Sequence, residues 1–154
     1  MKLGFIGAGR MAEAIIRGLI SARAVPKKNI YISDKEPSRL KQVAKKFQLN
    51  ALETNTDVIE ACDTIVLAVK PQVMGSVLTE ISGKVRQSQL VISIAAGITL
   101  KSLEKYLDKV PVIRVMPNNP SLIGEGISVL CGGKFAAEKD LRSRRIFFLP
   151  LATH

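Results

Sequence analysis

Histidine, cysteine and tryptophan are scarce in this 154-residue chain, which has one histidine, two cysteines and no tryptophan. The histidine is His154, the last residue of the sequence, which argues against a Ser-His-Asp triad, a histidine metal site and a histidine proton shuttle. Cys62 and Cys131 are far apart and neither belongs to a CxxC motif, so a disulfide scaffold and a cysteine zinc site are excluded. We therefore predict no metal site, and we assign no catalytic residue.

Long hydrophobic runs are also lacking. No stretch of about 18 apolar residues occurs, which predicts that no helix spans a membrane. The apolar run at the N-terminus is interrupted at Gly7 and Gly9, too early for the core of a signal peptide. Apolar residues nevertheless make up 47% of the chain and charged residues 23%, enough to bury a core. We expect a soluble, globular, cytoplasmic chain of about one domain, without a membrane partner.

The chain is basic, with 23 lysine and arginine residues against 13 aspartate and glutamate residues and a net charge of +10. Such an excess can indicate a nucleic-acid partner. The basic residues are spread along the polar sides of expected helices, for example at Lys41, Lys84 and Lys105, and are not interleaved with aromatic side chains. We therefore predict no nucleic-acid binding.

Short apolar runs alternate with segments of helical periodicity along the whole chain. The runs predict strands over residues 2–6, 29–33, 51–52, 64–69, 90–96, 110–116 and 127–131. Helical stripes lie between them, over residues 11–22, 37–47, 54–61, 71–81 and 99–107. Pro37 and Pro71 are expected in first helical turns, and Thr99 is expected to cap a helix. This alternation is typical of an α/β fold with a doubly wound parallel sheet, whose functional loops follow the carboxyl ends of the strands.

A glycine motif, Gly7-Ala8-Gly9-Arg10-Met11-Ala12, lies between the first expected strand and the first expected helix. It matches the G-x-G-x-x-A pattern of a dinucleotide-binding turn. Gly7 permits the tight turn, Gly9 lets the backbone approach a pyrophosphate, and Ala12 lets the helix pack closely on the strand. The N–H groups at the start of the helix would face the phosphates. A glycine turn that serves packing alone is the alternative, but the strand–turn–helix context favours a Rossmann-like domain that binds NADH or NADPH.

The choice between NADH and NADPH stays open at the end of the second expected strand. Asp34 would bond the ribose hydroxyls of NAD and repel the extra phosphate of NADP, although its distance along the chain from Gly7 is longer than usual. Ser33, Lys35 and Arg39 would instead hold a 2′-phosphate, or Lys35 and Arg39 would be plain surface charges.

Three further strand ends suggest where the rest of a dinucleotide would lie. Ala68-Val69-Lys70-Pro71 would form a tight backbone edge along it, with Lys70 near its phosphates or the nicotinamide ribose. The small side chains of Ala95-Ala96-Gly97 suit a flat ring, or form an ordinary strand-to-helix turn. Met116-Pro117-Asn118-Asn119-Pro120 is rigid and polar, and a plain turn would use the same residues.

Four strings in this order and spacing, GFIGAGRMAEAIIRGL, VLAVKPQ, SIAAGIT and RVMPNNP, resemble pyrroline-5-carboxylate reductase. The resemblance covers about residues 1–140, and VLAVKP and RVMPN are more specific than the glycine motif. The wider superfamily of 6-phosphogluconate and β-hydroxyacid dehydrogenases shares the glycine motif without this combination. The resemblance implies reduction of 1-pyrroline-5-carboxylate to L-proline with NADPH or NADH, in proline biosynthesis. An NAD(P)-binding module without turnover and another imine or β-hydroxyacid reductase are the alternatives.

The resemblance also implies roles for individual residues. It places the pyrophosphate at Ile6, Gly7, Ala8, Gly9, Arg10 and Met11, the adenosine side at Ser33 and Asn55, the nicotinamide half at Ala68, Val69, Lys70, Pro71, Ala95, Ala96 and Gly97, and the substrate near Met116, Pro117 and Asn118. Asn119 stands where the family usually has threonine. A protonated cyclic imine is already an electrophile, so the protein has mainly to position it and to stabilise charge. The sequence indicates no general acid.

We predict an NAD(P)-binding domain over residues 1–133 and a divergent or truncated tail over residues 134–154. The resemblance implies a second, all-helical domain that supplies most of the dimer interface in the homo-oligomers of the family, and we find no such segment in the sequence. The stretch LRSRRIFFLPLATH departs from the amphipathic helix of the family. We interpret it as the product of a frameshift or premature stop after about Leu141, with a natural divergent terminus as the alternative. Phe147, Phe148 and Leu149 would then add to an exposed apolar patch.

Overall fold

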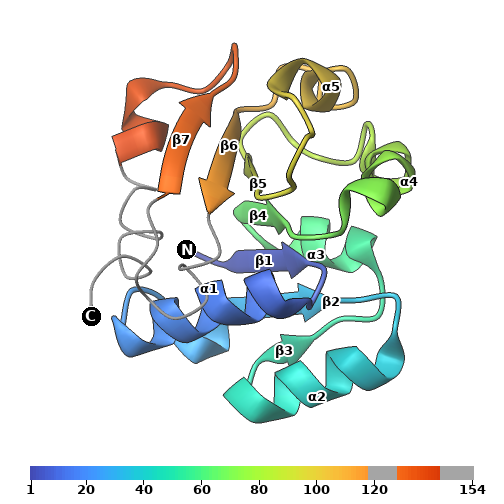
Figure 1. Cartoon of the computed structure of the whole chain (residues 1–154), viewed down its shortest axis with the longest axis vertical. Helices are drawn as coiled ribbons and strands as arrows, with labels where there is room; N and C mark the ends of the chain where they lie inside the picture. The colour runs from blue at the N-terminus through green and yellow to red at the C-terminus, as the bar shows by residue number, and fades with distance from the viewer. Residues whose placement is uncertain (118–127, 143–154) are drawn as a thin grey trace.

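Strands from distant parts of the chain meet in one sheet in the computed structural model, which describes residues 1–117 and 128–142. Within these ranges the sheet has seven strands in the order β3-β2-β1-β4-β5-β6-β7 (Figure 1). The strands are β1 (Leu3–Ile6), β2 (Ile30–Ser33), β3 (Asn50–Ala51), β4 (Thr64–Leu67), β5 (Leu90–Ser93), β6 (Val112–Pro117) and β7 (Ser128–Gly132). Strands β1 to β6 run parallel, so the predicted doubly wound α/β fold is confirmed.

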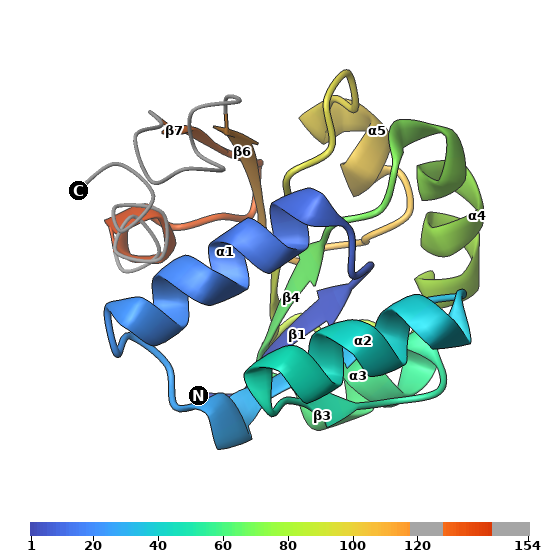
Figure 2. The same cartoon turned by 60° about the horizontal axis from the view of Figure 1, so that its bottom comes forward.

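Helices cover both faces of the sheet, and Figure 2 shows α1 and α4 on either side of β4. The helices within the described ranges include α1 (Arg10–Ser21), α2 (Pro37–Phe47), α3 (Asn55–Ala61), α4 (Pro71–Ile81) and α5 (Leu100–Glu104), with a short 3-10 turn, η1 (Lys27–Asn29). Side chains of α1 and α2 join one buried cluster, and side chains of α3, α4 and α5 join another on the opposite face. Because both faces are covered, the central strands are continuous apolar runs rather than alternating ones.

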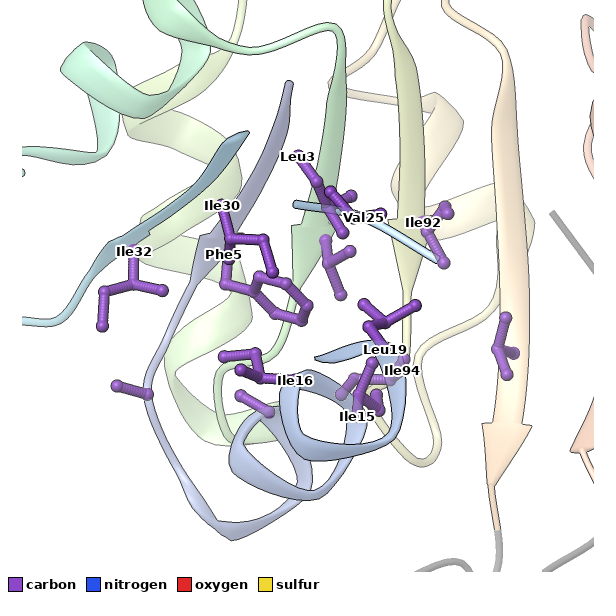
Figure 3. Close-up of a cluster of buried hydrophobic side chains, with 14 of the residues drawn as sticks. Leu3, Phe5, Ile15, Ile16, Leu19, Val25, Ile30, Ile32, Ile92 and Ile94 are labelled. Carbon is purple, nitrogen blue, oxygen red and sulfur yellow. The ribbon is translucent and has the colours of Figure 1, made fainter. Parts of the chain in front are cut away.

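The packing on β1 explains why the sheet and its helices approach so closely. Phe5 of β1 is buried against Ile16 and Leu19 of α1 (Figure 3). On the other face, a Cβ added at Gly4 would lie only 2.4 Å from a methyl carbon of Val58 in α3. Glycine at this position therefore allows α3 to lie directly on β1.

Local sequence signals predicted several helix boundaries correctly. Pro37 and Pro71 lie in the first turns of α2 and α4, where the missing N–H breaks no helical hydrogen bond. The hydroxyl of Thr99 accepts a backbone N–H of the first turn of α5 at 3.1 Å, as expected for a helix cap. Helix α5 ends at Glu104, earlier than its apolar stripe predicts, but Leu107 is still buried beyond its end.

The last strand of the sheet departs from the expected parallel arrangement. Strand β7 pairs antiparallel with β6, from Pro117 opposite Ser128 to Ile113 opposite Gly132. Residues 118–127, which join the two strands, are fewer than the dozen or so that a crossover between parallel strands requires. The expectation of an all-parallel sheet was therefore wrong for this strand.

The residues after β7 return to the sheet. Ala136 and Leu141 pack against the cluster on the α1 face, and residues 138–142 are helical. Residues 143–154, which include the predicted apolar patch at Phe147, Phe148 and Leu149, lie outside the described residues. Among the helices of the described ranges, none combines the length and the apolar composition that crossing a bilayer would require.

Candidate functional site

The carboxyl ends of β2, β1, β4 and β5 lie side by side at one edge of the sheet. Their registers align Ile6 with both Ser33 and Leu67, and Leu67 with Ser93. In the sheet, β2 and β3 follow β1 towards one edge, whereas β4 lies on the other side of β1 and the later strands follow it towards the opposite edge. Ligands of doubly wound sheets bind at such a reversal, because the loops on either side diverge there and leave room between them. The candidate site is therefore the set of loops that follow β1, β2, β4 and β5.

Gly7 begins the loop after β1 in a conformation that favours glycine. Its φ is +103°, and a Cβ added there would lie 2.7 Å from the carbonyl oxygen of Ala68. The Gly7 N–H donates to the Ser33 carbonyl at 2.9 Å, and the Ala68 N–H donates to the Ile6 carbonyl at 2.8 Å. The turn is thus held between the ends of β2 and β4, which is the tight turn that the sequence motif predicted.

The first turn of α1 opens directly beyond this turn. Gly9 occupies the N-cap position with no side-chain cap, and a Cβ added there would meet no atom within 4 Å. The N–H groups of residues 10–12 have no hydrogen-bond partner among the described residues. Ala12 is fully buried between the helix and the sheet, as the third small residue of the motif should be. Unpaired N–H groups at a helix N-terminus, facing open space, suit an anionic group such as a pyrophosphate.

Side chains that follow β2 bind the backbone of the glycine loop. Asp34 accepts the Ala8 N–H on one carboxylate oxygen at 2.8 Å and the Glu36 N–H on the other at 2.8 Å. Arg39 donates from Nε to the Ala8 carbonyl at 2.6 Å and from its guanidinium to Glu13 at 2.8 Å. Lys35 is exposed. In this structure Asp34 and Arg39 are therefore bound to protein groups.

Glu13, in the first turn of α1, is a residue of this region that the sequence motifs did not indicate. Lys46 donates a hydrogen bond to its carboxylate and lowers its pKa below the usual 4.5, partial burial opposes this effect, and Arg39 reinforces it. Arg17 lies one helical turn further along, 3.5 Å from the same carboxylate. The only signal in the sequence was an acidic residue near a helix N-terminus, which many helices carry.

Ser33 and Asn55, both expected at the adenosine side of a cofactor, lie together. The buried Ser33 hydroxyl donates to the Asn55 side-chain oxygen at 2.8 Å, and the Asn55 amide donates to Glu80 at 2.9 Å. Asn55 is the first residue of α3, and its place is set by the Thr54 cap, which forms a reciprocal capping box with Asp57. The fold therefore brings these two predicted residues from separate elements to one place.

The loops after β4 and β5 line the other side of the reversal. Ala68 and Val69 are half-buried, whereas Lys70 and Pro71 are exposed at the start of α4. Ala95 is buried, while Ala96 and Gly97 are exposed, and Gly97 has a φ of +73°. Within the described part of the chain, Lys70 forms no ion pair. Small side chains thus border the opening beside the glycine loop, and the exposed side chain of Lys70 lies among them.

The residues expected near a substrate are only partly described. Met116 is 44% exposed towards the end of β6, and Pro117 is the last residue of that strand. Asn118, Asn119 and Pro120 lie outside the described residues. In the described ranges, no three histidine, cysteine, aspartate or glutamate side chains come together as a metal site.

A protein-family model, described as "NADP oxidoreductase coenzyme F420-dependent", matches residues 2–97. Two curated relatives are pyrroline-5-carboxylate reductases. The one from Arabidopsis thaliana is 37% identical over 139 residues, which cover 90% of this chain and 50% of the relative. The one from Pseudomonas aeruginosa is 40% identical over 130 residues, which cover 84% of this chain and 47% of the relative. The chain spans about half the length of these relatives.

Solved structures of pyrroline-5-carboxylate reductases are also similar to this chain. A pyrroline carboxylate reductase from Plasmodium falciparum with NADP bound superposes with a TM-score of 0.86 at 33% identity, over 99% of this chain and 56% of the other. A pyrroline-5-carboxylate reductase from Coxiella burnetii superposes with a TM-score of 0.91 at 28% identity, over 99% and 57%. The resemblance seen in the four sequence strings is confirmed by these comparisons.

Proposed function

This chain belongs to the family of coenzyme F420-dependent NADP oxidoreductases, and we propose that it binds NADPH or NADH and serves the reduction of 1-pyrroline-5-carboxylate to L-proline. The observation that carries the proposal is the uncapped N-terminus of α1, which opens behind Gly9 at the reversal of the sheet. The relatives that match most of this chain support the choice of substrate. The similar fold of a solved structure that holds NADP supports the choice of cofactor.

Separate segments of this chain would each contact a different part of the cofactor. Residues 6–11 would receive the pyrophosphate on the free N–H groups of α1. Ser33 and Asn55, with Asp34 and Lys35 beside them, would face the adenosine half. Residues 68–71 and 95–97 would border the nicotinamide half, where small side chains let a flat ring lie on the backbone. Met116, Pro117 and Asn118 would lie near the nicotinamide and the substrate.

Reduction of the imine requires little catalytic chemistry from individual side chains of this chain. The bound nicotinamide supplies the hydride that reduces the imine carbon. The protein would hold the two reactants in line and stabilise charge, so no residue of this chain is assigned as a general acid. Lys70, exposed beside the glycine loop and free of any ion pair within the described residues, would balance the negative charge of the cofactor.

A titration followed by an activity assay tests the proposal. NADPH and NADH would be titrated separately into the protein and followed by nicotinamide fluorescence, and oxidation of each would then be measured with 1-pyrroline-5-carboxylate. Saturable binding followed by oxidation supports the full proposal. Binding without oxidation would reduce it to a dinucleotide-binding module, which the glycine loop and the uncapped start of α1 would explain equally well. Absence of binding would contradict both.

Three further parts of the proposal concern the whole protein. Residues 1–133 would form the dinucleotide-binding domain, a boundary supported by the end of β7 at Gly132, and residues 134–154 would be a divergent or truncated tail. The protein acts in the cytoplasm on a small-molecule substrate, without a nucleic-acid or membrane partner. Assembly into homo-oligomers, if it follows the family, is measurable by light scattering.

A further inference from the structure

Both polar groups of one backbone residue, Ala8, are bound by side chains from a different part of the chain. Asp34 accepts the Ala8 N–H at 2.8 Å, and Arg39 donates to the Ala8 carbonyl at 2.6 Å. Ala8 is fully buried and stands between the two glycines of the loop. The segment that joins β2 to α2 therefore grips the middle of the glycine loop at two points.

Every oxygen of the Asp34 carboxylate and every nitrogen of the Arg39 guanidinium already has a partner within the protein. The second carboxylate oxygen of Asp34 accepts the Glu36 N–H at 2.8 Å. Arg39 also binds Glu13 at 2.8 Å and the side chain of Gln42 at 3.1 Å, so each nitrogen of its guanidinium has a partner. A carboxylate that selects NAD would present a free oxygen to the ribose, and an arginine that selects NADP would present its guanidinium to the 2′-phosphate.

Glu13 extends the contact from the loop to the helix that follows it. Its side chain is only 13% exposed and lies in the first turn of α1, while the side chain of Arg39 is 25% exposed. Arg39 thus joins the Ala8 carbonyl to the helix whose N-terminus faces the opening. Such a link sets the position of the free N–H groups relative to the loop.

We propose that Asp34 and Arg39 are positioning residues, which together hold the glycine loop and the start of α1 in the shape that receives the pyrophosphate of either cofactor. This inference rests on the proposed function and deepens it. Because the pyrophosphate is common to NADH and NADPH, the contribution of both residues is the same for the two cofactors. Selection between the cofactors lies with other residues. A loop held in its binding shape loses less conformational freedom when the ligand arrives.

Asp34→Asn and Arg39→Met test this role, with Lys41→Met as the matched control. Lys41 is exposed on the same helix as Arg39, and its replacement removes the same charge without touching the loop. The dissociation constants of NADPH and NADH would be measured for each variant. We expect Arg39→Met and Asp34→Asn each to weaken both cofactors by roughly tenfold, the scale of one charge-assisted hydrogen bond, with an unchanged ratio between the two. Lys41→Met should change neither constant.

A second measurement separates positioning from general stability. Amide hydrogen exchange without nucleotide should show faster exchange at the Ala8 N–H in both variants, while exchange in the central strands stays as in the wild type. If Arg39→Met unfolds the chain, Glu13→Gln weakens the same link and should give a smaller, equal loss for both cofactors.

Two outcomes would overturn the positioning role alone. Loss of NADPH affinity with unchanged NADH affinity in Arg39→Met would make Arg39 a ligand of the 2′-phosphate. A selective loss of NADH affinity in Asp34→Asn would make Asp34 a ligand of the ribose. If the wild-type chain binds neither nucleotide, the proposed function fails, and the inference fails with it.

Discussion

Replacing Gly7 by alanine should destabilise the fold, whereas the same replacement at Gly9 should affect binding alone. The two glycines are two positions apart in one loop, but their surroundings differ. Gly7 has a φ of +103°, and a Cβ there would lie 2.7 Å from the Ala68 carbonyl oxygen and 2.8 Å from its carbonyl carbon. Gly9 has a φ of −75°, and a Cβ there would meet no atom within 4 Å. The pair is therefore a matched test of the loop geometry.

The size of the Gly7→Ala effect follows from two contributions. A non-glycine residue held in a rarely populated backbone conformation costs about 1–3 kcal/mol. Inserting a methyl group against backbone atoms that cannot rotate away costs about 1–3 kcal/mol more. The free energy of unfolding should thus fall by about 4 kcal/mol, a large part of the roughly 5–15 kcal/mol of a typical domain. For a chain of this length the melting temperature should fall by about 10 °C.

Gly9→Ala should weaken NADPH binding and leave the stability of the fold nearly unchanged. Alanine is a poorer N-cap than glycine, but its backbone conformation is allowed here, so stability should stay within about 1 kcal/mol of the wild type. The added methyl group would occupy the space in which we place the pyrophosphate and would weaken NADPH binding. Urea unfolding followed by circular dichroism, together with fluorescence titration of NADPH, measures both quantities. The reasoning would be refuted by a Gly7→Ala protein as stable as the wild type, or by a Gly9→Ala protein that loses as much stability as Gly7→Ala.

Three other predictions concern charge and thiol chemistry. Gly9→Asp should leave the fold intact and abolish NAD(P)H binding, since a carboxylate would stand against the pyrophosphate; wild-type affinity in the titration would contradict the assigned site. The folded-state pKa of Glu13 is lowered, chiefly by Lys46, so its stabilising contribution is present above the usual pKa of 4.5 and is lost as the pH falls below that value through the folded-state pKa. In urea unfolding, the stability difference between the wild type and Glu13→Gln should therefore shrink over this acidic range, and a difference independent of pH would disprove it. Burial raises the pKa of the Cys62 thiol to about 12; the charge of Asp63 adds to this effect and the charge of Lys2 opposes it. Cys131, in contrast, is exposed. A thiol reagent at neutral pH should therefore modify Cys131 quickly and Cys62 only after unfolding, and rapid modification of both would show that Cys62 is accessible.

Much of the fold could be predicted because its signals are local. The prolines of α2 and α4 mark first turns because a missing N–H does no harm there, and Thr99 caps α5 because its side chain can reach a neighbouring N–H. The tight turn at Gly7 was predicted correctly for the same reason, since the chain turns there with a φ of +103° that favours glycine. In each case the residues that decide the structure are a few positions apart.

The direction of β7 and the contacts of Arg39 could not be predicted in this way. Hydrophobic periodicity predicts that β7 is a strand, but it does not determine that β7 pairs antiparallel with β6. Arg39 meets Ala8 and Glu13, which are 31 and 26 residues away in the sequence. As a charge near the end of β2, it was open to interpretation as a phosphate ligand or as a surface residue.

The sequence by itself thus determined the order of strands and helices, the parallel sheet through β6 and the glycine turn at its edge. Short-range backbone preferences and hydrophobic periodicity suffice for these features. Only the tertiary structure decided which side chains are bound to which groups, above all that Asp34 and Arg39 hold Ala8. These contacts depend on α1 and α2 packing side by side on one face of the sheet. The local sequence around each of these residues does not indicate which distant residue it will contact.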